Sequence, residues 1–144
     1  MADSFLDSLQ RIFARERLLT DPAQLAPYER DLTMPMAVRP RAVVFATERQ
    51  QVIDTVRACY EHRVPYVARG AGSSLCGGSL PVEGGIVLVL KQLNRVLAVD
   101  PRSRTAVVEP GVVNLDVSRA AEPYGLCYAP DPSSQAFCTI GGNV

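Results

Sequence analysis

A glycine-rich stretch at residues 69–81 constrains the fold of this chain most strongly, because it directly follows a short apolar run, Val64-Pro65-Tyr66-Val67-Ala68. Its glycines allow positive φ and leave backbone N–H groups uncovered: Gly70, Gly72, Gly77 and Gly78. Such N–H groups can converge on phosphate oxygens, and nearby hydroxyl groups add donors: Ser73, Ser74 and Ser79. Strand ends in α/β units are common ligand sites, so we expect an anion-binding loop, the alternative being a mobile loop without ligand.

Two common phosphate-binding loops do not match this stretch. The P-loop needs a lysine after its last glycine, and no lysine occurs between Arg69 and Lys91. The dinucleotide fingerprint begins correctly at Gly70 and Gly72 but has Leu75 in place of its third glycine. Residues 76–81 contain two glycines and a proline and cannot begin a stable helix. We therefore expect backbone amides to hold the anion without a helix dipole.

Three segments in a fixed order carry a resemblance to a known family. They are Arg69 to Gly78, then Val108-Glu109-Pro110-Gly111-Val112, then Pro130-Asp131-Pro132-Ser133-Ser134 running into residues 139–144. Together they resemble the FAD-binding region of FAD-linked oxidases of the vanillyl-alcohol oxidase type. The resemblance is closest to the FAD-binding subunit of glycolate oxidase and its D-2-hydroxyacid dehydrogenase relatives, and it covers roughly residues 38–144.

The resemblance implies an α+β fold, a PCMH-type FAD-binding domain. This would be a small parallel β-α-β subdomain followed by the start of a mixed or antiparallel one. We expect residues 1–37 to form an N-terminal helical segment and residues 38–144 the incomplete FAD-binding domain. The implied activity is oxidation of 2-hydroxy acids such as glycolate or D-lactate, with an iron-sulfur electron-transfer subunit as partner. The alternative is a catalytically inactive fragment or a noncatalytic interaction module with an exposed sheet edge.

The resemblance also implies which residues contact the cofactor. FAD would be bound noncovalently, because Ser73 stands where some relatives carry the histidine that attaches the flavin. The implied contacts are Arg69, Gly70, Ala71, Gly72, Ser73, Ser74, Gly77, Gly78, Pro110, Pro130, Asp131, Ser133, Thr139, Gly141, Gly142 and Asn143. The chain stops inside its third motif, which predicts a C-terminal truncation, with catalytic residues beyond Val144 and no turnover by this chain alone.

Composition excludes several classes of function. Fifteen basic and fifteen acidic residues give a formal net charge of zero, which argues against nucleic acid and anionic membranes as partners. The N-terminus lacks a basic region and a long apolar core, so we expect a cytoplasmic protein without a transmembrane segment. The four cysteines lack metal-site spacing, so no metal is expected. We expect Cys59 and Cys127 to be buried, and Cys76 and Cys138 to line the pocket.

Periodicity predicts the remaining elements. An amphipathic helix is expected over residues 4–17, with one apolar face: Phe5, Leu6, Leu9, Ile12 and Phe13. Asp21-Pro22 is typical of the start of a second helix. A strand at 41–46 leads through a capping box at 47–50 into a helix to Glu61 with a buried stripe: Val52, Val56, Cys59 and Tyr60. A buried strand at 85–90, an antiparallel hairpin of 95–100 and 105–109, and a helix over 113–122 complete the expectation.

Overall fold

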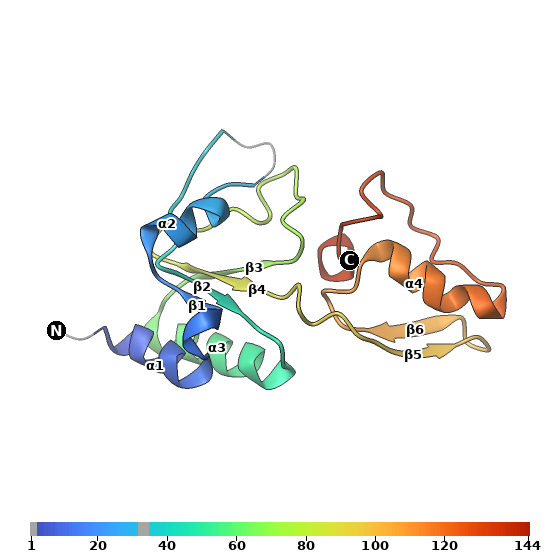
Figure 1. The fold of residues 1–144 in the computed structure, drawn as a ribbon, viewed down its shortest axis with the longest axis horizontal. Helices are drawn as coiled ribbons and strands as arrows, with labels where there is room; N and C mark the ends of the chain where they lie inside the picture. The colour runs from blue at the N-terminus through green and yellow to red at the C-terminus, as the bar shows by residue number, and fades with distance from the viewer. Residues whose placement is uncertain (1–2, 32–34) are drawn as a thin grey trace.

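The structure is a computed structural model that describes residues 3–31 and 35–144. Figure 1 shows two bodies joined by the chain that follows strand β4 (Ile86–Val89). The first body contains a four-stranded sheet with helices on both faces, and the second contains a two-stranded hairpin beside a helix. This mixture of parallel and antiparallel pairing confirms the α+β prediction.

The sheet of the first body positions the glycine-rich loop. Its strand order is β1-β2-β4-β3, in which β2 (Ala42–Phe45), β4 and β3 (Tyr66–Arg69) are parallel. Both β2 and β4 are apolar and largely buried, as expected for central parallel strands. Arg69 and Val89 pair in register, so β3 and β4 end at the same edge of the sheet. The loop and the connection to the second body therefore leave from neighbouring points.

Helices cover the two faces of this sheet. Helix α1 (Ser4–Ile12) packs on α3 (Arg49–His62), and its apolar side chains Phe5 and Leu9 enter the core with β2 and β4. The opposite face is covered by α2 (Pro22–Leu25) and the 3₁₀ helix η2 (Ala26–Tyr28). Asp21 caps α2 through the Ala23 N–H at 2.9 Å, which confirms the predicted helix start. The N-terminal residues thus share one core with the sheet.

Four details of the first body differ from the expectation. Helix α1 ends at Ile12 rather than near residue 17, and the chain continues through the 3₁₀ helix η1 (Arg15–Arg17) into β1 (Leu18–Leu19). Strand β1 pairs antiparallel with β2, so the N-terminal segment is not purely helical. The side chain of Gln51, not Gln50, bonds back to the Thr47 N–H at 2.9 Å, because α3 begins one residue later than predicted. Tyr60 is 86% exposed, because Ala58 and Cys59 take the buried side of α3.

The second body is built on a hairpin. Strands β5 (Val96–Asp100) and β6 (Thr105–Val108) pair antiparallel as predicted, and α4 (Asn114–Ala121) lies against them. The 3₁₀ helix η3 (Glu122–Tyr124) follows, and the described chain closes with the short helix α5 (Ile140–Asn143). No helix among the residues described here combines the length and apolar character needed to cross a membrane.

Cys127 is exposed, so its predicted burial is wrong. The chain reverses at Gly125, where φ is 69°, after η3. It then runs back along the outside of α4, where the Tyr128 N–H donates to Ser118 Oγ at 3.1 Å. Cys59 is buried as predicted, and burial raises the pKa of its thiol to about 11. A thiol with so high a pKa is not a nucleophile at neutral pH.

An ion pair joins the ends of the hairpin and provides a pH-dependent test. Arg95 Nη2 donates to Glu109 Oε1 at 2.7 Å, and this bond holds the pKa of Glu109 below its usual 4.5. A lowered folded-state pKa stabilises the fold above pH 4.5, and that contribution is lost as pH falls through the folded value. Glu109→Gln should therefore lower the free energy of unfolding at pH 7, and this difference should shrink as the pH falls below 4.5. Urea unfolding across this range checks it, and a difference that is constant with pH would contradict it.

Candidate functional site

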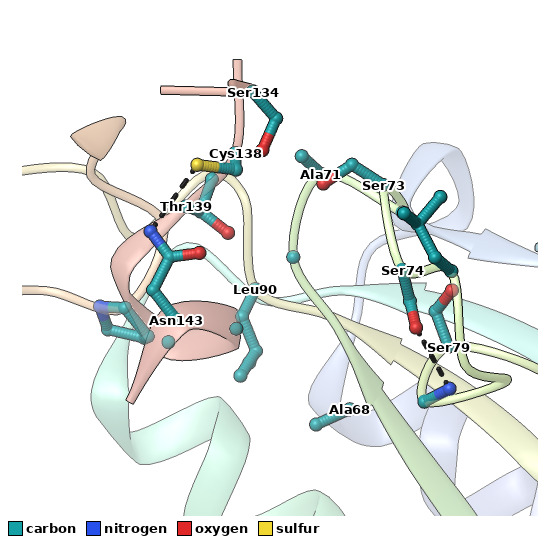
Figure 2. A pocket seen from close by; sticks show the side chains of 17 residues that line it. Ala68, Ala71, Ser73, Ser74, Ser79, Leu90, Ser134, Cys138, Thr139 and Asn143 are labelled. Carbon is teal, nitrogen blue, oxygen red and sulfur yellow. Dashed lines mark hydrogen bonds between the residues drawn. The ribbon is translucent and has the colours of Figure 1, made fainter. Parts of the chain in front are cut away.

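The three sequence motifs meet around one pocket of about 400 Å³. One wall is the loop that follows β3, and the other is the segment that ends in α5 (Figure 2). Figure 2 shows Ala71, Ser73, Ser74 and Ser79 on the loop side, facing a second group of labelled side chains: Ser134, Cys138, Thr139 and Asn143. Residues about 70 positions apart along the chain thus line a single cavity of the size that small-molecule sites have.

The second wall is assembled from the second and third motifs. The Gly141 N–H donates to Pro110 O at 2.8 Å, and the Ile140 N–H donates to Val112 O at 2.9 Å. Gly141 must lack a side chain, because an added Cβ would lie 2.7 Å from Pro110 Cβ. The two walls touch where Gly70 meets Thr139, whose Oγ1 would be 2.1 Å from a Cβ added at Gly70. The glycines of the motifs therefore serve close backbone packing between the walls.

The glycine loop leaves a run of amides for a ligand. Gly72 has φ 75° and Gly77 has φ 78°, as expected for a loop that glycine must build. The N–H groups of Cys76 and Gly78 are already bonded to Ser74 Oγ, at 3.3 and 3.0 Å. By contrast, the N–H groups of residues 71–74 have no hydrogen-bond partner among the residues that the structure describes. These four amides are the donors that the loop offers to an anion.

A buried hydroxyl group adds to this donor set. Ser79 lines the pocket and is only 5% exposed, yet its Oγ has no hydrogen-bond partner within the described part of the chain. Buried polar atoms without a partner are rare and costly in folded proteins. The Oγ itself is covered from solvent, so a ligand oxygen would have to come into direct contact with this wall of the pocket to satisfy it. Ser79 is thus a polar group of the pocket wall whose hydrogen-bonding capacity is unused among the described residues.

The structure brings most of the predicted site residues to the pocket. Those that line it are Gly70, Ala71, Gly72, Ser73, Ser74, Gly78, Pro110, Thr139, Gly141, Gly142 and Asn143. Those that do not line it are Arg69, Gly77, Pro130, Asp131 and Ser133. Arg69 turns behind the loop and donates to Ser79 O at 3.2 Å, and the Gly77 N–H donates to Asp31 at 2.7 Å. The proline-braced segment reaches the pocket only through Ser134.

The pocket also contains residues outside the predicted set of cofactor contacts: Ala68, Leu75, Ser79, Leu90, Ser134 and Cys138. Ala68 and Leu90 lie at the carboxyl ends of β3 and β4, where parallel sheets commonly bind ligands, so topology could have indicated them. Cys138 lines the pocket as expected, and its Sγ accepts a hydrogen bond from Asn143 Nδ2 at 3.3 Å. Cys76 does not line it, because the turn around Ser74 directs it to solvent.

A larger cavity elsewhere on the molecule lacks a buried, unpartnered polar side chain among the described residues. It has a volume of about 1000 Å³, lies beside α1 and is lined by residues such as Gln10, Phe13 and Gln24. The buried, unpartnered side-chain atoms found in the described chain are Ser79 Oγ and Asn114 Oδ1, and neither residue lines that cavity. No cluster of metal-ligating side chains occurs in residues 3–31 and 35–144. The pocket between the three motifs is therefore the candidate site.

Solved structures with the same fold define its class. p-Cresol methylhydroxylase with substrate bound matches 99% of this chain and 30% of its own chain, with a TM-score of 0.81 and 26% identity. Alkyldihydroxyacetonephosphate synthase matches 99% of this chain and 28% of its own, with a TM-score of 0.85. At 21% identity the second likeness concerns the fold alone. The fold is that of a PCMH-type FAD-binding domain.

The chain belongs to the FAD binding domain family, which it matches over residues 40–144. It is 46% identical over 129 residues to glycolate oxidase subunit GlcD of Escherichia coli (strain K12), covering 90% of this chain and 26% of the relative. The D-2-hydroxyglutarate dehydrogenase of Stutzerimonas stutzeri (strain A1501) is 33% identical over 98% of this chain and 30% of its own length. The chain thus spans about a quarter to a third of the curated relatives it matches.

FAD fits the chemistry of the pocket. A diphosphate needs several hydrogen-bond donors, and residues 71–74, whose amides have no partner among the described residues, line the pocket together with Ser79. An aromatic ring needs close backbone approach, and a Cβ added at Gly142 would meet nothing within 4 Å. The pocket therefore offers both an anion-binding side and an open side.

Proposed function

We propose that this chain is the FAD-binding part of a flavin-dependent oxidoreductase that acts on 2-hydroxy acids such as glycolate or D-lactate. The observation that carries the proposal is the convergence of the three motifs on a pocket with a buried, unpartnered Ser79 hydroxyl. The names of the relatives support the substrate class, since they include a glycolate oxidase subunit and a D-lactate dehydrogenase. When bound, the flavin supplies the two-electron redox chemistry that protein side chains lack.

The chain's own residues would bind and orient the cofactor. The loop amides and Ser79 would hold the diphosphate, and the wall formed by Thr139 and the glycines of α5 would approach the flavin ring. The proposed contacts are those predicted residues that line the pocket. Residues 38–144 would form the binding unit, and α1 and β1 of the N-terminal segment 1–37 pack on it.

The first test separates cofactor from substrate. The 144-residue chain is titrated with FAD and, in parallel, with riboflavin, while flavin fluorescence is followed. FAD should bind more tightly than riboflavin because only FAD carries the diphosphate. The protein that contains this chain is then assayed for dye reduction with glycolate, D-lactate and D-2-hydroxyglutarate. If FAD binds but none of these acids reduces the dye, the FAD-binding site is supported and the proposed substrate class is contradicted.

Flavin attachment gives a separate prediction. Ser73 lines the pocket where an attachment histidine would be needed, and a serine hydroxyl does not form such a bond, so the cofactor should be noncovalent. Acid precipitation of the flavin-loaded protein should leave essentially all the flavin in the supernatant. Absorbance of supernatant and pellet checks this, and flavin retained in the washed pellet would contradict it.

Partners and location complete the proposal. The word subunit in the names of the glycolate oxidase relatives supports an assembly, and we propose an iron-sulfur subunit as its electron acceptor. The free cysteine thiols support a cytoplasmic location. Co-purification followed by iron analysis, and cell fractionation, test the two points.

A noncatalytic interaction module is the second candidate. The β5–β6 hairpin exposes Leu97 and Val107, at 56% and 57%, and such apolar side chains commonly mark contact surfaces. The FAD titration separates the candidates, because an interaction module has no need to bind FAD in preference to riboflavin.

A further inference from the structure

Arg69 holds the glycine loop from the side away from the pocket. Its Nη1 donates to Ser79 O at 3.2 Å and to Arg30 O at 3.1 Å, and its guanidinium lies 5.6 Å from the centre of the Tyr28 ring. The same guanidinium lies beneath Gly72, where an added Cβ would be 2.5 Å from Nη2. Arg69 thus connects both ends of the loop to the segment that follows α2.

Asp31 forms the second half of this support. Its Oδ2 accepts the Gly77 N–H at 2.7 Å, and the residue is only 9% exposed. Burial lowers the pKa of Arg69, and the charges of Tyr28 and Asp31 partly oppose this effect. The two opposite charges therefore lie near each other behind the loop. Asp31 precedes residue 40, where the match to the FAD-binding family begins.

The hydrogen bonds from Arg69 to Ser79 O and from the Gly77 N–H to Asp31 determine which groups of the loop remain available to a ligand. Ser79 O accepts a hydrogen bond from Arg69, while the same residue lines the pocket and its buried hydroxyl has no partner among the described residues. The Gly77 amide is turned to Asp31, and neither Asp31, Arg69 nor Gly77 lines the pocket. Buried hydrogen bonds that are fully made restrict the groups they join, so these bonds can fix a glycine loop that would otherwise be mobile.

We propose that Asp31 and Arg69 are positioning residues for the diphosphate of the bound cofactor. They hold the loop from the side away from the pocket, so that Ser79 and residues 71–74 keep their places in the pocket wall. Asp31 acts by accepting the Gly77 N–H rather than by its charge. Arg69 acts by its planar guanidinium, which lies over the Tyr28 ring and whose Nη1 donates to both Ser79 O and Arg30 O. The inference rests on the proposed function, because it assumes that the pocket binds the diphosphate of FAD.

Inorganic pyrophosphate is the probe, and the amide resonances of the 144-residue chain are the readout. In the wild-type chain, pyrophosphate should shift the resonances of residues 71–74 and 79. Asp31→Ala removes the acceptor and should weaken this binding by about 10-fold or more, whereas Asp31→Asn keeps an acceptor and should stay within about threefold. Arg69→Lys keeps the charge but loses the planar guanidinium, and it should also weaken binding by about 10-fold. Asp54→Ala, which removes a surface carboxylate paired with Arg57, is the control and should bind like the wild type.

The outcomes distinguish a failure of this inference from a failure of the proposed function. Wild-type pyrophosphate affinity in both Asp31→Ala and Arg69→Lys would overturn the inference but would not contradict the proposed FAD-binding site. If Asp31→Ala does not fold, Arg69→Lys and Asp31→Asn decide: an unchanged affinity in the former or a lost affinity in the latter overturns it. Absence of any shift at residues 71–74 in the wild-type chain would overturn the proposed function together with the inference.

Discussion

Gly72→Val should abolish FAD binding, with a loss of at least about 100-fold in affinity, equivalent to about 2.7 kcal/mol. Gly72 has φ 75°, a region that a β-branched residue avoids, and its Cβ would lie 2.5 to 2.8 Å from the Arg69 guanidinium. Both effects displace the loop amides that the proposal assigns to the diphosphate. The helical far-ultraviolet signal should remain, because α1 and α3 pack in a core away from this loop. Titration with FAD alongside circular dichroism measures both.

Gly84→Val is the matched control. Gly84 has φ 72°, almost the same backbone conformation, but nothing lies within 4 Å of its added Cβ and it does not line the pocket. It should lose stability for the same conformational reason while binding FAD like the wild type. Equal flavin affinity in the two variants would place the phosphates elsewhere.

Gly111→Ala should destabilise the whole domain more than any exposed substitution. An added Cβ would lie 2.5, 2.6 and 2.7 Å from the carbonyl oxygens of Leu90, Lys91 and Leu93, and backbone atoms cannot move aside as a flexible side chain can. The Gly111 N–H also donates to Leu93 O at 2.7 Å, which holds the second body to the chain leaving β4. We expect a loss of about 3 kcal/mol and a fall in melting temperature of about 10 °C.

Gly142→Ala serves as its control, measured by the same thermal unfolding. Gly142 lies in α5 with nothing within 4 Å of its added Cβ, so alanine should be neutral or slightly stabilising there. A Gly111→Ala chain as stable as Gly142→Ala would show that the segment around Gly111 can separate without cost. In that case the second wall of the pocket would not depend on the contact between Gly111 and residues 90–93.

Local pattern in the sequence determined much of the fold. Short apolar runs with β-branched residues predicted strands at 41–46, 85–90, 95–100 and 105–109, which the structure contains, and Asp21-Pro22 predicted a helix start. These elements depend on neighbours a few residues away, so periodicity and capping residues suffice to predict them. The three motifs in their order likewise resemble those of a flavin-binding family, to which the chain belongs.

Only the tertiary structure decided which side of each element faces the pocket. Arg69 and Gly77 belong to the glycine motif, yet their polar groups turn to Arg30 and Asp31, 39 and 46 residues away. Tyr60 continues an apolar stripe by spacing but is exposed, and Leu18–Leu19 form a strand only because β2 offers an edge. In each case the orientation depends on a partner distant along the chain. Sequence pattern can identify the donors and acceptors of such a loop, but their directions are set by long-range contacts that form when the chain folds.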